Sequence, residues 1–144
     1  MSIRPLQRSD IAVAKDLLKQ LGYDMPADEL LLRLRCVLAA NGHYAACAEH
    51  DGRVVGLVHV FERPALEKPS EAVVQALVVD NEARGKGVGR TLMAAAEQWA
   101  KMRGLKYVVL HTRIDRDEAQ AFYGQIGYER AAASYLMRKS LTAS

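Results

Sequence analysis

Three glycines at every second position mark a corner where a predicted strand passes into a predicted helix. The stretch "VVDNEARGKGVGRTLM", residues 78 to 93, runs from β-branched residues through Gly85, Gly87 and Gly89 into a helical apolar pattern. Glycine has no Cβ, so it adopts positive φ angles and lets a ligand approach the backbone closely. Successive amide N–H groups can then point into one concavity at a helix N-terminus, where the helix dipole favours an anion. The corner therefore predicts an anion-binding loop.

Charged side chains around the glycines narrow the choice of ligand. Arg84, Lys86 and Arg90 bring positive charge to the loop, which suits a di- or polyphosphate better than a single carboxylate. The loop fits neither GxxxxGK(S/T) nor GxGxxG, and no acidic residue ends the next predicted strand to bind a ribose hydroxyl, so Walker and Rossmann loops are disfavoured. A flexible surface turn with solvated cations is the alternative. The flanking strand and helix favour binding.

The length and composition of the chain favour one globular domain. Of the 144 residues 50% are hydrophobic, which allows a core without disulfides or metals, so we expect a single domain over residues 1–144. The net charge of +3 is small and spread along the chain, which disfavours a nucleic-acid partner. The sequence starts without an apolar leader pattern, and no apolar run is long enough to span a bilayer, so no membrane partner is expected.

Cysteine and histidine usage predicts a cytoplasmic protein without a metal site. Cys36 and Cys47 lie in apolar surroundings without CxxC spacing, which is typical of reduced core thiols. The histidines lack close metal-ligand spacing, so no metal is expected. They are His43, His50, His59 and His111. The last of these ends a predicted strand, where it could line a cleft or simply pack.

Hydrophobic periodicity predicts the elements that position the glycine corner. Strands are expected at residues 3–6, 43–50, 53–61, 72–79 and 106–112, and helices at 11–21, 26–40, 90–103 and 118–126. Asp51-Gly52 predicts a tight hairpin. Residues 72–112 form a strand-helix-strand unit with parallel strands and a right-handed crossover. Residues 128–140 are expected to add one or two strands, so the fold class is α/β (α+β), a mixed sheet with helices on its faces.

Two linked stretches resemble a known family. The glycine corner matches R/Q-x-x-G-x-G/A, and "AQAFYGQIGY", residues 119–128, places a helix tyrosine before a glycine-aromatic turn. In order and spacing, residues 72–128 resemble the GCN5-related N-acetyltransferases, whereas the first 70 residues are similar only in the arrangement of elements. The resemblance implies a mostly antiparallel sheet that is splayed between its fourth and fifth strands, which are parallel, with the pantetheine arm of acetyl-coenzyme A in the gap.

The resemblance also implies roles for single residues. Amides of the glycine loop would bind the coenzyme pyrophosphate, and Leu77 and Val79 would offer backbone hydrogen bonds to the pantetheine, with an N–H near Val79 available to the oxyanion. Tyr123 matches the tyrosine that hydrogen-bonds the coenzyme sulfur and protonates it. Simple packing beside Phe122 is its alternative role. The implied coenzyme-binding set is Leu77, Val79, Arg84, Gly85, Lys86, Gly87, Val88, Gly89, Arg90 and Tyr123.

The general base is not singled out by spacing. The candidates are Glu71, Gln75, His59 and Glu67. The family position that carries a glutamate in some relatives corresponds to Val73, which cannot accept a proton, so a water relay anchored by Glu71 is the preferred hypothesis. Many relatives also have an asparagine where this chain has Arg116, and the contribution of that side chain stays open.

These residues predict an N-acetyltransferase that moves an acetyl group from acetyl-coenzyme A directly to a primary amine of a small molecule, peptide or protein. The alternative is a coenzyme A-binding sensor or regulatory module without turnover. Residues 23–25 lie where the family often covers the acceptor, and Glu62, Glu67 and Glu71 could attract a cationic amine. The apolar segment "ASYLMRKSL" would present an uncovered strand edge, which leaves both a monomer and a homodimer open.

Overall fold

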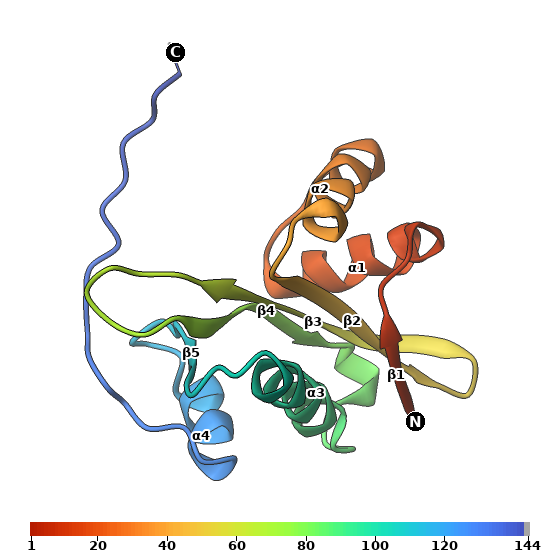
Figure 1. Cartoon of the computed structure of the whole chain (residues 1–144). Coiled ribbons are helices and arrows are strands. Elements are labelled where there is room, and N and C mark those ends of the chain that lie inside the picture. Colours follow the sequence, from red (N-terminus) through yellow and green to blue (C-terminus); the bar gives the residue numbers. More distant parts are fainter. Residues whose placement is uncertain (143–144) are drawn as a thin grey trace. The chain divides into compact units, whose positions relative to one another are not determined.

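The computed structural model describes residues 1–142, which fall into two compact units, Met1–His111 and the residues from Thr112 onward. The first unit holds a five-stranded sheet in the order β1-β2-β3-β4-β5 (Figure 1). Its strands are β1 Ser2–Pro5, β2 His43–His50, β3 Arg53–Arg63, β4 Glu71–Val79 and β5 Val108–Leu110. The first four pair antiparallel in sequence order, and β4 pairs parallel with β5. The predicted mixed, mostly antiparallel sheet is confirmed.

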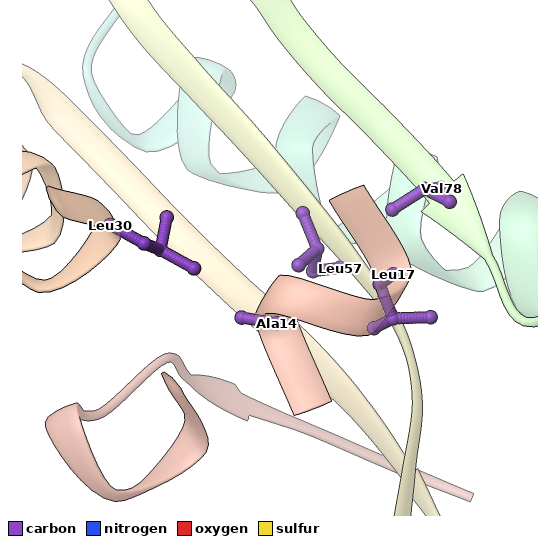
Figure 2. Packing of buried hydrophobic residues seen from close by; sticks show 5 residues of the cluster. All are labelled: Ala14, Leu17, Leu30, Leu57 and Val78. Carbon is purple, nitrogen blue, oxygen red and sulfur yellow. The ribbon is translucent and has the colours of Figure 1, made fainter. Parts of the chain in front are cut away.

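Helices cover both faces of this sheet. Helices α1, Ile11–Leu21, and α2, Ala27–Ala39, lie on one face, and α3, Val88–Met102, lies on the other (Figure 1). On the α1/α2 face, a buried apolar cluster joins the two helices to β3 and β4 (Figure 2). Its members are Ala14, Leu17, Leu30, Leu57 and Val78. Burial of a leucine such as Leu17 contributes roughly 2 kcal/mol, so this cluster fixes the helices on the sheet.

Two turns form as the sequence predicts, because each places residues that tolerate positive φ where it is needed. The hairpin between β2 and β3 turns at Asp51 and Gly52, whose φ angles are 52° and 75°. Two consecutive positive φ angles are the signature of the tight turn that matches strand twist. Helix α1 ends at Gly22, whose φ of 112° lies in the left-handed region. Both turns bring the following element back onto the sheet.

As far as residue 142, the second unit contains one helix, α4, Asp117–Gln125, and the predicted strands after it are wrong. Residues 129–142 have no regular secondary structure. Alternating apolar residues form a strand only where a neighbouring strand supplies backbone partners, and the sequence pattern contains no information about that neighbour. For the same reason β5 is shorter than predicted, since only Val108, Val109 and Leu110 find partners on β4.

The cysteines differ from each other in burial. Cys47 on β2 is a buried free thiol, as expected of a core residue, and burial raises its pKa. Cys36 is also free but exposed on α2, so the prediction of a core position is wrong for this residue. Among the helices of residues 1–142, none combines the length and the apolar character that crossing a bilayer requires.

Candidate active site

The outer edge of β4 is open along its second half. Pairing with β5 runs only from Ala72, opposite Val108, to Val74, opposite Leu110. Within the described residues, the part of β4 from Gln75 to Val79 has no partner on the β5 side. The two parallel strands therefore separate at this point, as the predicted splay requires.

A β-bulge lies where the two strands separate. The β3–β4 register pairs His59 with Ala76 but Val60 with Val74, so Gln75 is one extra residue on β4. A bulge of this kind bends its strand and changes which way the following backbone groups point. The side chain of Gln75 is exposed. Nothing in the sequence pattern of the strand signalled the bulge.

The bulge turns two backbone amides toward the open edge. Before it, the N–H of Ala72 donates to a carbonyl on the β5 side at 3.0 Å. After it, the N–H of Asp80 donates to a β3 carbonyl at 2.8 Å. Backbone groups alternate between the two edges of a strand. The N–H groups of Leu77 and Val79 therefore face away from β3, toward the edge that β5 leaves free.

The turn between β4 and α3 is anchored at several points. It contains a short 3-10 helix, η2, Asn81–Ala83, which the Asp80 carboxylate caps by accepting from the N–H of Glu82 at 3.2 Å. The N–H of Asn81 donates to the side-chain oxygen of Gln20 on α1 at 2.9 Å, and Ala83 is buried. These contacts fix the position of residues 80–83, from which the glycine loop starts.

Two of the three glycines have the conformation that only glycine readily adopts. Gly85 and Gly87 have φ angles of 78° and 80°, and Gly87 is the N-cap of α3. A Cβ at either position would meet no atom within 4 Å, so the backbone there borders open space. Gly89 lies inside the first turn of α3, which begins at Val88 instead of the predicted residue 90. The first amides of this turn have no acceptor within the helix, which leaves them available to an anion.

The predicted cations surround this helix end. The side chains of Arg84, Lys86 and Arg90 are exposed, and none of the three is held in an ion pair with another residue of the described range. Their charge adds to that of the N-terminal end of α3. The site therefore combines backbone donors, mobile positive charge and open space, which together suit a diphosphate.

The acidic residues that were expected to attract an amine do not gather. Glu71 projects on the α1/α2 side of β4, where Lys68 at 3.0 Å and Arg63 at 3.1 Å bind its carboxylate. Lys68 first, and then Arg63, lowers the pKa of Glu71, which makes it a weaker base. Glu62 pairs instead with Arg103 after the end of α3, at 3.0 Å. The third of these acidic residues, Glu67, is exposed.

A pair of histidines on β2 and β3 was not predicted. The Nδ1 atom of His43 lies 3.0 Å from the Nε2 atom of His59, and both rings are half-buried. Phe61 stacks on His43 with the ring centroids 5.1 Å apart. The Asp51-Gly52 turn alone would place His43 opposite Val60. A register shift between Ala48 and Glu49 brings His43 opposite Phe61 instead, and no sequence pattern signalled that shift.

The predicted catalytic tyrosine lies in the second unit, on α4. Tyr123 is half-buried and packs edge-to-face against Phe122 and Tyr128, with ring centroids 5.1 and 5.9 Å away. Gly127, with φ 98°, reverses the chain so that the N–H of Tyr128 donates to the carbonyl of Tyr123 at 2.9 Å. Burial raises the pKa of Tyr123, so its hydroxyl stays protonated at neutral pH. The spacing of Tyr123, Gly127 and Tyr128 in the sequence is thus explained by this turn at the end of α4.

Three further predicted positions have simple surroundings. Arg116 is the N-cap of α4 but makes no side-chain cap, whereas an asparagine there could accept from the helix amides. His111 is exposed directly after β5. Of residues 23–25, Asp24 and Met25 line a hollow of about 310 Å³ together with Lys15 and Pro26. Within residues 1–142, no group of three or more His, Cys, Asp or Glu side chains could hold a metal ion.

The fold combines a mixed sheet that opens between β4 and β5 with a glycine loop at the N-terminus of α3. The model of the Acetyltransferase (GNAT) family matches residues 12–128. The chain belongs to this family, as its two linked sequence stretches predicted.

Similar proteins include enzymes that act on different amines. The aminoglycoside N(6')-acetyltransferase type 1 of Stenotrophomonas maltophilia is 30% identical over 149 residues, covering 99% of this chain and 95% of that protein. The aminoalkylphosphonate N-acetyltransferase of Salmonella typhimurium is 33% identical over 96 residues, covering 66% of this chain and 62% of that protein. A solved structure of AAC(6')-Iy with the bisubstrate analogue CoA-S-monomethyl-acetylneamine shares the fold, with a TM-score of 0.86 at 22% identity over 96% of this chain and 97% of that one.

Proposed function

We propose that this protein transfers an acetyl group from acetyl-coenzyme A directly to a primary amine of a small molecule, peptide or protein. One observation carries the proposal: the free amides of Leu77 and Val79 lead along β4 into the glycine loop and the N-terminus of α3. Such a line of donors fits an extended arm that ends in a diphosphate. The family match over residues 12–128 supports the same chemistry.

In this proposal the coenzyme is bound mainly by backbone. The amides from Arg84 to Arg90 bind the diphosphate, and the exposed cations of that stretch add long-range attraction. The N–H groups of Leu77 and Val79 bind the pantetheine, and an N–H near Val79 stabilises the tetrahedral oxyanion. A backbone site of this kind needs no metal, and we propose none.

Two side chains complete the proposed chemistry. Glu71, held ionised by Lys68 and Arg63, anchors a water that receives a proton from the acceptor amine. Tyr123, carried over from the family motif and kept protonated by burial, gives a proton to the leaving thiolate. The nitrogen lone pair forms the amide bond as the C–S bond breaks, and the products are an acetylated amine and free coenzyme A.

The Tyr123 role is tested by removing one hydroxyl. With Tyr123→Phe we expect kcat to fall by a factor of about 100 or more, while the Kd for acetyl-coenzyme A stays within twofold, because the hydroxyl acts on the thiolate. Steady-state kinetics and calorimetry measure the two quantities. Tyr135→Phe, an exposed tyrosine of the same unit, is the matched control. Unchanged turnover in Tyr123→Phe would remove this residue from the mechanism.

A coenzyme A-binding sensor without turnover is the alternative. Calorimetry with acetyl-coenzyme A, ATP and NAD ranks the ligand classes, and we expect acetyl-coenzyme A to bind most tightly. A screen of amines with a free-thiol readout then separates enzyme from sensor. Tight binding without thiol release from any amine would favour the sensor, and tighter binding of ATP than of the coenzyme would contradict both.

The organisation of the protein is also proposed. We place all 144 residues in a single acetyltransferase domain that acts in the cytoplasm on an amine acceptor, without nucleic-acid or membrane partners. Mostly exposed apolar side chains near the C-terminus support a homodimer. They are Tyr135, Leu136, Met137 and Leu141.

A further inference from the structure

The side chain of His59 is half-buried on the α1/α2 face of the sheet, next to the point where β4 and β5 separate. Residues two apart in a strand share a face, so His59 projects with Leu57 toward the α1/α2 side. On the opposite face Val58 and Val60 are fully buried. Across the ladder, His59 is paired with Ala76, the residue that follows the bulge and precedes Leu77. An acceptor amine that reaches the open edge of β4 from the α1/α2 face therefore passes close to His59.

The two histidines form a pair that can hold one extra proton. The facing atoms, Nδ1 of His43 and Nε2 of His59, are 3.0 Å apart, so one of them carries the hydrogen and the other offers a lone pair. The two histidine rings are partly stacked, with centroids 5.2 Å apart, and Phe61 stacks on the His43 ring with centroids 5.1 Å apart. This stack limits rotation of the rings, which keeps the hydrogen bond in place. Each ring still has one further nitrogen outside the pair.

We propose that the His43–His59 pair takes the proton that the acceptor ammonium must lose before attack. His59 accepts this proton. His43 acts through His59, since it holds the His59 ring in position and passes a proton on to solvent. The inference rests on the proposed acetyl transfer and deepens it.

The proton balance of this step is simple. The ammonium gives one proton, directly or through a water molecule, to Nδ1 of His59. The hydrogen on Nε2 of His59 moves to Nδ1 of His43, and His43 releases a proton from its own Nε2 to solvent. The neutral amine attacks the thioester carbonyl, and its second proton leaves as the C–N bond forms and ends on the coenzyme sulfur. One proton is released for each amide made.

The surroundings of the pair agree with a relay. Burial, and then His43, lowers the pKa of His59 to about 4, so the two rings do not carry charge together. The other ionisable groups on this face of β3 and β4 are Arg63 and Glu71, which pair with each other and with Lys68 toward the β3–β4 loop. Because His59 alone is a weak base, it passes a proton on to His43, which releases one to solvent.

The test compares amines of different basicity. His59→Gln and His43→Gln are assayed with the alkylamine that the wild type acetylates best, and with its alkoxyamine counterpart, whose nitrogen is unprotonated at neutral pH. We expect kcat/KM for the alkylamine to fall by a factor of about 100 for His59→Gln, and by about 10 for His43→Gln. For the alkoxyamine the loss should stay within threefold. Added imidazole should restore part of the loss with the alkylamine.

Controls separate this inference from protein damage and from the proposed function. His50→Gln, an exposed histidine at the end of β2, should behave as wild type, and calorimetry should give an unchanged Kd for acetyl-coenzyme A in every variant. If His59→Gln does not fold, His43→Gln decides. Equal losses with both amines, or no loss, overturn the relay while wild-type acetyl transfer stands. A wild type that acetylates no amine overturns the proposed function and the relay together.

Discussion

His59 makes the stability of the fold depend on pH. Its pKa is lowered from the usual 6.5 to about 4, mainly by burial, so the unfolded chain binds a proton more readily than the folded protein. Stability is then complete above pH 6.5 and decreases as the pH falls toward 4. We expect a loss of at most about 3 kcal/mol in the free energy of unfolding, measured by urea titration at several pH values.

The contribution of His59 can be separated from that of the carboxylates. Asp10 and Glu71 also contribute stability that the protein loses in acid, because cation partners lower their pKa values below 3.8 and 4.5. This loss occurs at lower pH than the loss caused by His59. His59→Asn should remove only the part between pH 6.5 and 4. The variant minus wild-type difference therefore isolates the imidazole. Parallel pH profiles for the two proteins would show that His59 is not buried as described.

At the scale of elements, the glycine loop depends on backbone conformation more than on space. Gly87 has φ 80° and no atom within 4 Å of an added Cβ, so Gly87→Ala should cost about 1 to 2 kcal/mol through strain alone. Strain at the N-cap of α3 should also misalign the first helix amides. We expect at least tenfold weaker binding of acetyl-coenzyme A, measured by calorimetry.

Gly22→Ala is the matched control for the loop. Gly22 also has positive φ, 112°, and open space around it, but it ends α1 and is not part of the loop. Its alanine variant should lose stability and keep the coenzyme affinity of the wild type. Equal loss of affinity in both variants would mean that stability, and not the loop, controls binding.

The packing of α3 on β3 requires a glycine for a different reason. A Cβ at Gly56 would lie 2.9 Å from a Leu92 methyl and from the carbonyl oxygen of Val78, and 3.2 Å from Val88. The β4 carbonyl cannot move without disturbing the sheet, so Gly56→Ala should destabilise the protein by about 1 to 3 kcal/mol. Gly124→Ala, with nothing within 4 Å and no positive φ, should be neutral or slightly stabilising. Thermal or urea unfolding distinguishes the two.

Local patterns predicted the elements better than the contacts between them. The apolar spacing of residues 11–21 and the Asp51-Gly52 turn act through nearby residues, and both form as predicted. The extra residue Gln75 and the His43–His59 pair depend on how three strands align, which periodicity does not contain. The Arg63 and Lys68 contacts of Glu71 were missed for the same reason. The glycine loop was predictable because its chemistry lies within seven consecutive residues.

At the scale of the whole molecule, exposed apolar residues bear on self-association. Leu136 and Met137 are 92% and 86% exposed, in a segment without regular structure. We expect a homodimer in sedimentation experiments, because pairing would remove such side chains from water. Combined Leu136→Ser and Met137→Ser should shift the protein to monomer, whereas Leu66→Ser, an exposed leucine in the β3–β4 loop, should not. A monomeric wild type would end this expectation.

The single extra residue in β4 has a consequence for how the length of this strand can change. Upstream of Gln75 the even-numbered amide of Ala72 points toward β5, and downstream the even-numbered amide of Asp80 points toward β3. Deleting one residue would restore the alternation and rotate the donors of Leu77 and Val79 inward, against β3, even if every side chain stayed apolar. Removing two residues would keep the donors outward. In the proposed binding mode, the number of residues in β4 therefore matters through being odd or even, because this decides whether the donors of Leu77 and Val79 face the coenzyme.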